Sequence, residues 1–295
     1  LVIFADQYAK HLVRTRLALN ESWSPFPWLA PYARILHIQN TGAAFGMFKQ
    51  AGGIFTIAGW KQKGQQGYGW LLGFDLSSAV VMDKTYAGIQ SWHAAVTSSK
   101  GELAAFGQKI GGGSVGALIA PDASVIWQQD IAFGGQLTHA AAMADGGFLV
   151  AGVMQDNKPD TPAETFPMLV VVARLDATGN TLWLTKHGWT APAEFDLSGV
   201  AATTDGGYLV AGSFAGYWYG LRGLADGKGL WAKGYHPAGG KGQSRDMAVL
   251  CGDGMAMVGS STAGGPKGGW WVMRTDSAGN VPGNPATQVM PILVP

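Results

Sequence analysis

The feature that most constrains the fold is a short segment that occurs five times along the chain. Each copy joins a few apolar residues to a final glycine, as in "DGGFLVAG" from Asp145 and "DGGYLVAG" from Asp205. The other copies are "GGIFTIAG", "KGELAAFG" and "DGMAMVGS", and the reference glycines of the five are Gly59, Gly107, Gly152, Gly212 and Gly259. These glycines recur at intervals of 45 to 60 residues, which is typical of repeat architectures.

Each copy lies inside a longer unit. A run of small residues precedes it, and after it come an apolar run that ends near an Asp, a turn, and a final run that often contains Trp. Because the segments "DGG" and "DATGN" supply the residues that tight turns require, each unit is predicted to form four short antiparallel strands. The fifth unit lacks its Trp strand, and we expect "ARILHIQ" (residues 33–39) or "QVMPILVP" (residues 288–295) to complete it.

Stacking of these units predicts an all-β fold. A four-stranded unit cannot bury both faces alone, so we expect a five-bladed β-propeller of four-stranded blades with an extended N-terminal segment; a six-bladed ring or an open stack is the alternative. The content of 45 glycines, with only 13% charged residues, favours strands and turns over long helices. The predicted division is an extension over 1–43 and a propeller over 44–295, with units starting near 44, 92, 138, 197 and 245.

The pattern "DGGYLVAG" followed by "LDATGNTLW" resembles the blades of secreted kelch-like and quinoprotein-like β-propeller repeat proteins. The resemblance covers about residues 44–295. It implies an extracellular or cell-surface protein that acts as a binding or structural, self-assembling module. The implied partners are a protein, a glycan or further copies of the chain, and no catalytic residues are carried over.

The N-terminal segment has a second resemblance. "DQYAK" followed by "HIQNTGAAFG" is similar to two motifs of lipoprotein signal peptidase, a membrane aspartic peptidase, and the matching positions include Asp6, Gln7, Lys10, Asn40 and Gly42. The resemblance implies a membrane peptidase as the alternative function. The family's two catalytic aspartate motifs do not occur in the sequence, so a peptidase is not favoured, and membrane association is expected only through this segment.

Aromatic clusters are the candidate ligand-binding residues. The runs Tyr217, Trp218, Tyr219 and Trp270, Trp271 place consecutive aromatics on one strand, where neighbouring side chains point to opposite faces and one can contact a sugar or a protein. Trp127, Trp183 and Trp231 instead recur at matching places in their units. We expect them to wedge between blades.

Polar residues in the units allow two further interpretations. His93 and His139 lie 14 and 13 residues before their reference glycines, and Asp246 lies at the matching place of the fifth unit. Two imidazoles and a carboxylate are a ligand set that a divalent metal accepts, and ordinary hydrogen bonding at a strand start is the alternative. The repeated turn aspartates are expected to cap backbone N–H groups; they are Asp75, Asp122, Asp176, Asp226 and Asp276.

Composition excludes several classes of function. The formal net charge of +1, with 20 basic and 19 acidic residues, provides no basic surface for nucleic acid. Cys251 is the single cysteine, and no nucleotide-binding or nucleophile motif occurs; no cofactor is expected. Low charge favours self-association into an oligomer or polymer. The first residue is Leu1 rather than Met, which indicates a processed or truncated N-terminus.

Overall fold

The structure is a computed structural model of the 295-residue chain. It describes residues 15–16, 22–23, 35–36, 55–75, 77–98, 100–155, 168–188, 195–235, 241–262, 269–282 and 288–289. The chain divides into two compact units, residues 1–53 and 54–295. In the first unit, β1 (Ser22–Trp23) pairs antiparallel with β2 (Ile35–Leu36).

The described residues of the second unit form five antiparallel sheets, in which, apart from β21, strands consecutive in sequence pair with each other. The first sheet contains β3 (Phe55–Lys63), β4 (Gln66–Phe74) and β5 (Val80–Tyr86). The second contains β6 (Ile89–Thr97), β7 (Leu103–Lys109), β8 (Ser114–Ile119) and β9 (Val125–Ile131). The third contains β10 (Gln136–Ala142), β11 (Phe148–Gln155), β12 (Met168–Leu175) and β13 (Thr181–Gly188). The fourth contains β14 (Phe195–Ala202), β15 (Tyr208–Phe214), β16 (Tyr217–Gly223), β17 (Gly229–Tyr235) and β21 (Gln288–Val289), and the fifth contains β18 (Gly242–Val249), β19 (Met255–Ser261) and β20 (Gly269–Arg274).

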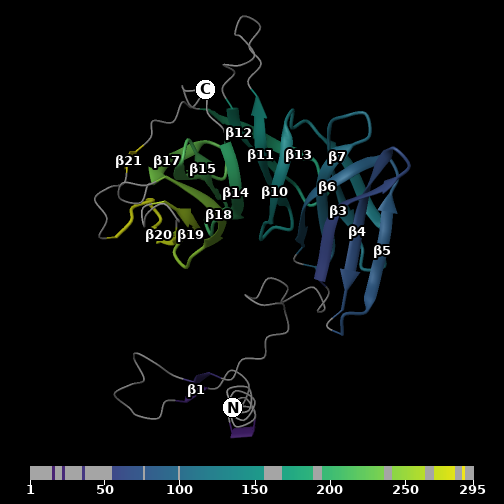
Figure 1. Ribbon diagram of the computed structural model, residues 1–295, viewed down its shortest axis with the longest axis horizontal. Coiled ribbons are helices and arrows are strands. Elements are labelled where there is room, and N and C mark those ends of the chain that lie inside the picture. The colour runs from purple at the N-terminus through teal and green to yellow at the C-terminus, as the bar shows by residue number, and fades with distance from the viewer. Residues whose placement is uncertain are drawn as a thin grey trace, which may run out of the picture. The chain divides into compact units, whose positions relative to one another are not determined.

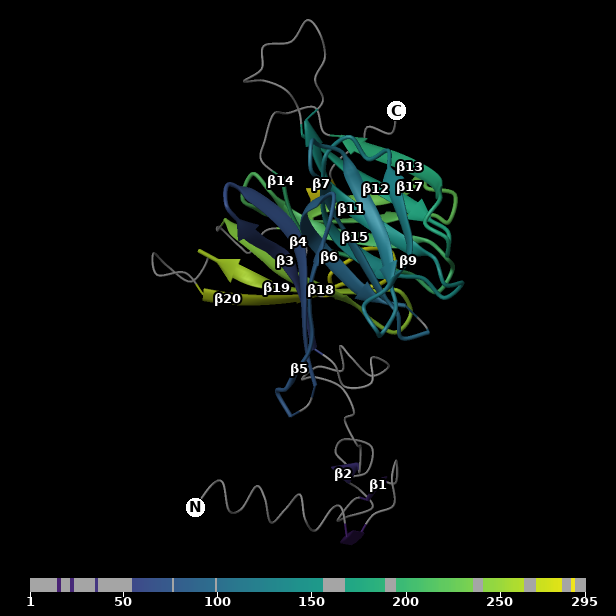
Figure 2. The same ribbon diagram turned by 90° about the vertical axis from the view of Figure 1, so that its right-hand side faces the viewer.

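The sheets stand side by side like the blades of a propeller (Figures 1 and 2). Each packs on the next through its first strand, so that β6, β10, β14 and β18 are successive neighbours. The all-β, blade-based fold expected from the sequence is therefore confirmed. In Figure 1 the described strands form an open arc, with β3–β5 at one end and β18–β20 at the other.

The structure corrects the expectation for the fifth unit. The C-terminal strand β21 extends the fourth sheet by pairing with β17, through Lys233 opposite Val289. Residues Ile35–Leu36 of the other predicted segment pair with β1 instead. Among the described strands the fifth sheet thus has three members, and β20 is its outer edge.

Apolar side chains fill each junction between sheets. Strand alternation sends neighbouring residues to opposite faces, so Leu149 of β11 packs towards the fourth sheet while Val150 packs towards the second. Both side chains are fully buried. The interior strands therefore lack the polar alternation of a sheet with one wet face.

Tryptophan side chains connect the second, third and fourth sheets to a turn of the sheet that follows, as the sequence predicts. The indole Nε1 of Trp183 donates to the backbone carbonyl of Ala225 at 2.9 Å. Its ring lies on Gly227, where a Cβ would be 2.9 Å from the indole. Trp127 and Trp231 make the equivalent contacts with the turns of the third and fifth sheets. A glycine is needed at position 227 for two reasons. A side chain there would collide with the indole, and the backbone φ of +90° favours a residue without a side chain.

The turn aspartates cap backbone N–H groups, but they occupy two positions rather than one. Asp75, Asp176 and Asp276 begin their turns and accept from the N–H four residues later. Asp122 and Asp226 stand at the third turn position and accept from the N–H two residues later. The side-chain hydrogen bond from Ser77 holds the pKa of Asp75 below its ordinary value, so this cap is ionised at neutral pH.

His187 of β13 is a fully buried titratable group. Its Nε2 lies 2.7 Å from the hydroxyl of Tyr208, which itself donates to the carbonyl of Gly227 at 2.9 Å. Burial lowers the pKa of His187 to about 4, so the imidazole is neutral in the folded protein at pH 7.

The Trp183→Ala variant should lower the free energy of unfolding by roughly 2–4 kcal/mol, because it removes an inter-sheet ring and its hydrogen bond. Urea unfolding monitored by circular dichroism measures the change. The control is Leu182→Ala, since Leu182 is 59% exposed on the same strand. Equal losses in the two variants would contradict the role assigned to the indole.

Lowering the pH from 6.5 to 4 should destabilise the fold. In this window the unfolded chain binds a proton at His187 that the folded chain does not, so the free energy of unfolding falls, by up to roughly 3 kcal/mol from this group. The His187→Leu variant should lose much less stability across the window. Denaturant midpoints at several pH values test this, with Lys186→Gln as the control, and an unchanged pH dependence in His187→Leu would refute it.

Candidate functional site

A β-bulge occurs at the same place in the first strand of the second to fifth sheets. In each case the register shifts by one residue opposite the reference glycine, and the extra residues are His93, Thr138, Ser198 and Arg245. The glycine makes the bulge sterically feasible, because a Cβ at Gly152 would lie 2.0 Å from the carbonyl oxygen of Gln136. All four bulge residues are polar, and bulges re-aim side chains at functional sites in many folds.

The bulges change the equivalence expected from sequence. His93 is a bulge residue and matches Thr138, whereas His139 matches Asp246, one position later. The two histidines are thus not equivalent, because counting residues back to the glycine does not reveal which residue is extruded from the ladder.

Hydrogen bonds engage both nitrogens of the His93 ring. Nδ1 lies 3.1 Å from the carbonyl oxygen of Leu137 in the third sheet, and Nε2 lies 2.7 Å from the hydroxyl of Ser91. The hydroxyl of Ser198 similarly lies 2.7 Å from that of Ser244 in the fifth sheet. These bulge side chains therefore connect neighbouring first strands. A cleft beside His93 is lined also by Gln108, Ser114 and Gln136 of the second and third sheets.

His139 is half-buried and lies in the electrostatic field of two carboxylates. Burial lowers its pKa, while Asp196 and Asp246 act in the opposite direction. Its Nδ1 lies 2.9 Å from the hydroxyl of Thr138. Within the described residues, no three His, Cys, Asp or Glu side chains are grouped closely enough to hold a metal ion. The predicted set of His93, His139 and Asp246 is therefore not brought together as one site.

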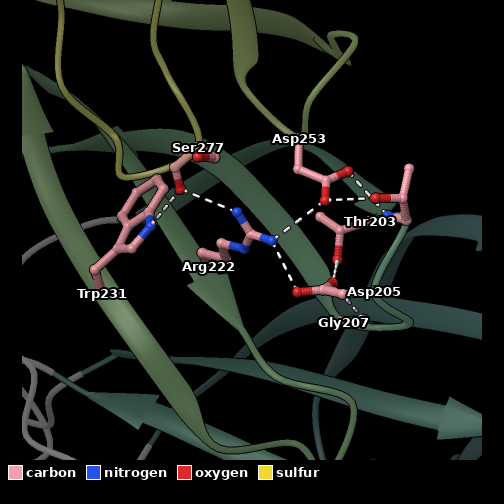
Figure 3. A network of polar contacts seen from close by, with 8 residues as sticks. Thr203, Asp205, Gly207, Arg222, Trp231, Asp253 and Ser277 are labelled. Carbon is pink, nitrogen blue, oxygen red and sulfur yellow. Dashed lines mark hydrogen bonds and ion pairs between the residues drawn. The ribbon is translucent and has the colours of Figure 1, made fainter.

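A network of polar contacts joins the fourth and fifth sheets (Figure 3). The guanidinium of Arg222 donates to Asp205 at 2.9 Å within its own sheet, and to Asp253 and the carbonyl of Ser277 in the fifth sheet at 3.3 and 3.0 Å. Asp253 also accepts from the backbone N–H of Thr204 at 2.9 Å. One guanidinium thus links two carboxylates from neighbouring sheets, so the network serves inter-sheet adhesion. Arg174 and Asp145 form the corresponding ion pair of the third sheet.

The predicted aromatic set is divided between core and surface. Trp218 and Tyr219 are fully buried, and Trp271 packs on Trp218 with ring centroids 4.4 Å apart. Tyr217 is half-buried, whereas Trp270 is 84% exposed. A surface ligand can therefore contact Trp270, whereas Trp218 and Tyr219 are not accessible to it.

Trp270 belongs to an apolar face at the end of the arc. Trp271 and Met273 pack towards the fourth sheet, so strand alternation turns Trp270, Val272 and Arg274 away from it. We call this surface the C-terminal end face. It comprises Asp246, Ala248, Ala256, Val258, Ser260, Trp270, Val272 and Arg274.

The first sheet has an apolar outer surface of the same kind. Ala58 and Leu71 pack towards the second sheet, so Ile57, 51% exposed, points the other way. This N-terminal end face has an apolar part and a polar part. The apolar part is Phe55, Ile57, Trp70, Leu72 and Phe74, and the polar part is Lys61, Asp83 and Thr85, since Asp83 pairs with Leu72 and Thr85 with Trp70. The repeat pattern does not distinguish it from an internal face, because the same alternation occurs in every unit.

The peptidase-like residues Asp6, Gln7, Lys10, Asn40 and Gly42 lie outside the described residues. Among the residues that are described, no helix is long and apolar enough to span a membrane.

Comparison with known proteins gives one family match and several structural ones. Residues 1–119 match the family described as Signal peptidase (SPase) II. The part of this match that the structure describes from Phe55 onward is made of strands and turns. No curated protein sequence matches the chain.

The structural matches have low sequence identity. A protein of unknown function from Bacteroides caccae is similar with a TM-score of 0.47 and 13% identity, over 80% of this chain and 72% of that one. Virginiamycin B lyase from Staphylococcus aureus is similar with a TM-score of 0.38 and 8% identity, over 76% of this chain and 88% of that one. No function follows from similarities at this level.

Proposed function

We propose that this chain is a non-enzymatic binding module of the extracellular space or cell surface, whose partner is a protein, a glycan or another copy of itself. The observation that carries the proposal is the C-terminal end face, where Trp270 and Val272 are 84% and 72% exposed. Large aromatic side chains on an exposed apolar face are typical of recognition surfaces.

The polar groups at the junctions between sheets support the same conclusion. A catalytic base needs a free nitrogen or carboxylate aimed at a substrate. His93 uses both ring nitrogens in hydrogen bonds to the protein, and Arg222 is paired with two carboxylates. His93 and Arg222 act in contacts between sheets, and this supports placing the partner on the exposed end faces.

The Trp270→Ala variant should weaken binding to such a partner by about 30-fold, as expected for loss of a central aromatic contact. Biolayer interferometry against a glycan array and immobilised protein fractions measures the difference between wild type and variant. Trp60→Ala is the matched control, since Trp60 is 58% exposed but lies outside both end faces. Equal affinity of wild type and Trp270→Ala for every ligand would count against the proposal.

A second candidate, a signal peptidase-like activity, rests on the match of residues 1–119 to that family. The two aspartate motifs that would supply a shared-proton carboxylate pair are not found in the sequence. We expect no cleavage of a lipid-modified precursor peptide by the full chain in detergent micelles, assayed by mass spectrometry. Cleavage by wild type that the Asp6→Asn variant loses would favour the peptidase over the binding module.

A further inference from the structure

The four internal junctions of the arc show what covers each kind of sheet face. In the second to fifth sheets, one pair of residues always faces the preceding sheet. It consists of the residue two positions before the reference glycine and its partner on the third strand. The four pairs are Ala105 and Ala117, Val150 and Ala173, Val210 and Leu221, and Met257 and Met273. All eight side chains are buried. Each is covered by the opposite face of the sheet before it.

Among the described residues, no sheet covers the same surface on the N-terminal end face. Ile57 and Leu72 are the corresponding pair of the first sheet. Ile57 is 51% exposed, and Leu72 is half-buried. By its position in the repeat, this face is built to receive the opposite face of a preceding sheet.

The C-terminal end face is the complementary surface. Trp270 has the register of Trp218 in the fourth sheet and Val170 in the third, both fully buried against the next sheet. Val272 similarly has the register of the fully buried Val172. This face is therefore built to lie under a following sheet.

Resting on the proposed binding function, we infer that the partner is a second copy of this chain, with the C-terminal end face of one copy packed on the N-terminal end face of the next. Within one chain the two faces stand at opposite ends of the arc (Figure 1). A second copy supplies both missing covers at once. The contact is head-to-tail, so it generates a ring of chains or a filament.

Arg274 adds a polar contact to this interface. It has the register of Arg222, whose guanidinium donates to the carbonyl of Ser277 in the turn of the next sheet. The guanidinium of Arg274 has no ion pair or hydrogen bond among the described residues. The matching turn of a second copy is the one that begins at Asp75, whose lowered pKa keeps it negative. By analogy with Arg222, the guanidinium of Arg274 is expected to donate to a backbone carbonyl of that turn.

The test uses two variants of the full chain. Val272→Asp places a charge on the C-terminal end face, and Ile57→Asp places one on the N-terminal end face. Multi-angle light scattering of wild type should give masses that are multiples of 30.9 kDa and that increase with protein concentration. Each variant alone should stay monomeric. An equimolar mixture should form a heterodimer, because each variant retains the face that the other lacks. Leu182→Asp, an exposed change on β13, should assemble like wild type.

Each other result overturns the inference. These are a wild type that stays monomeric at every concentration, variants that assemble like wild type while circular dichroism shows them folded, or a mixture that stays monomeric although wild type assembles. A monomeric wild type in which Ile57→Asp and Val272→Asp both lower the melting temperature indicates ring closure within one chain. A monomer that binds a glycan or protein through Trp270 overturns self-association alone. A monomer for which Trp270→Ala has no effect overturns the binding function as well.

Discussion

Face-to-face packing of neighbouring sheets is the interaction on which the second unit of this chain depends. A sheet of three or four short strands has two apolar faces, and in water it can bury neither by itself. Leu149 and Val150, adjacent in β11, are both fully buried because one packs on the fourth sheet and the other on the second. The stability of each sheet is therefore shared with both neighbours, and a sheet at the end of the arc lacks half of that stabilisation.

Two polar devices hold the sheets in register while the apolar faces supply most of the burial. At the turns, an indole such as that of Trp183 reaches across to a carbonyl and lies on a glycine. At the first strands, the bulge residue His93 reaches the carbonyl of Leu137 in the next sheet. Because hydrogen bonds are directional whereas apolar contact is not, these contacts fix how far each sheet slides and rotates on its neighbour.

The repeat in the sequence was sufficient to predict the strands, the turns and the role of Trp183, because these depend on local periodicity and on residues that recur. The bulges were not predictable, since extrusion of His93 from the ladder depends on how two strands pair. The placement of β21 on β17 was missed for a related reason: an apolar segment such as "QVMPILVP" suits any open strand edge, and only the folded geometry chooses one. Trp218 is fully buried and Trp270 is largely exposed, although the sequences around the two residues look alike.

The end faces follow from the same logic that makes the repeat stable. An internal sheet needs two complementary faces, and a unit copied along the chain carries both of them even where it has no neighbour. Capping repeats solve this problem with polar residues on the outer face, but here the outer faces keep Ile57 and Val272. Retention of apolar residues at both ends leaves the arc with one surface of each kind, and these two surfaces are complementary to each other rather than to themselves. An interface built from them is directional, and it leaves one of each free after every addition until a ring closes.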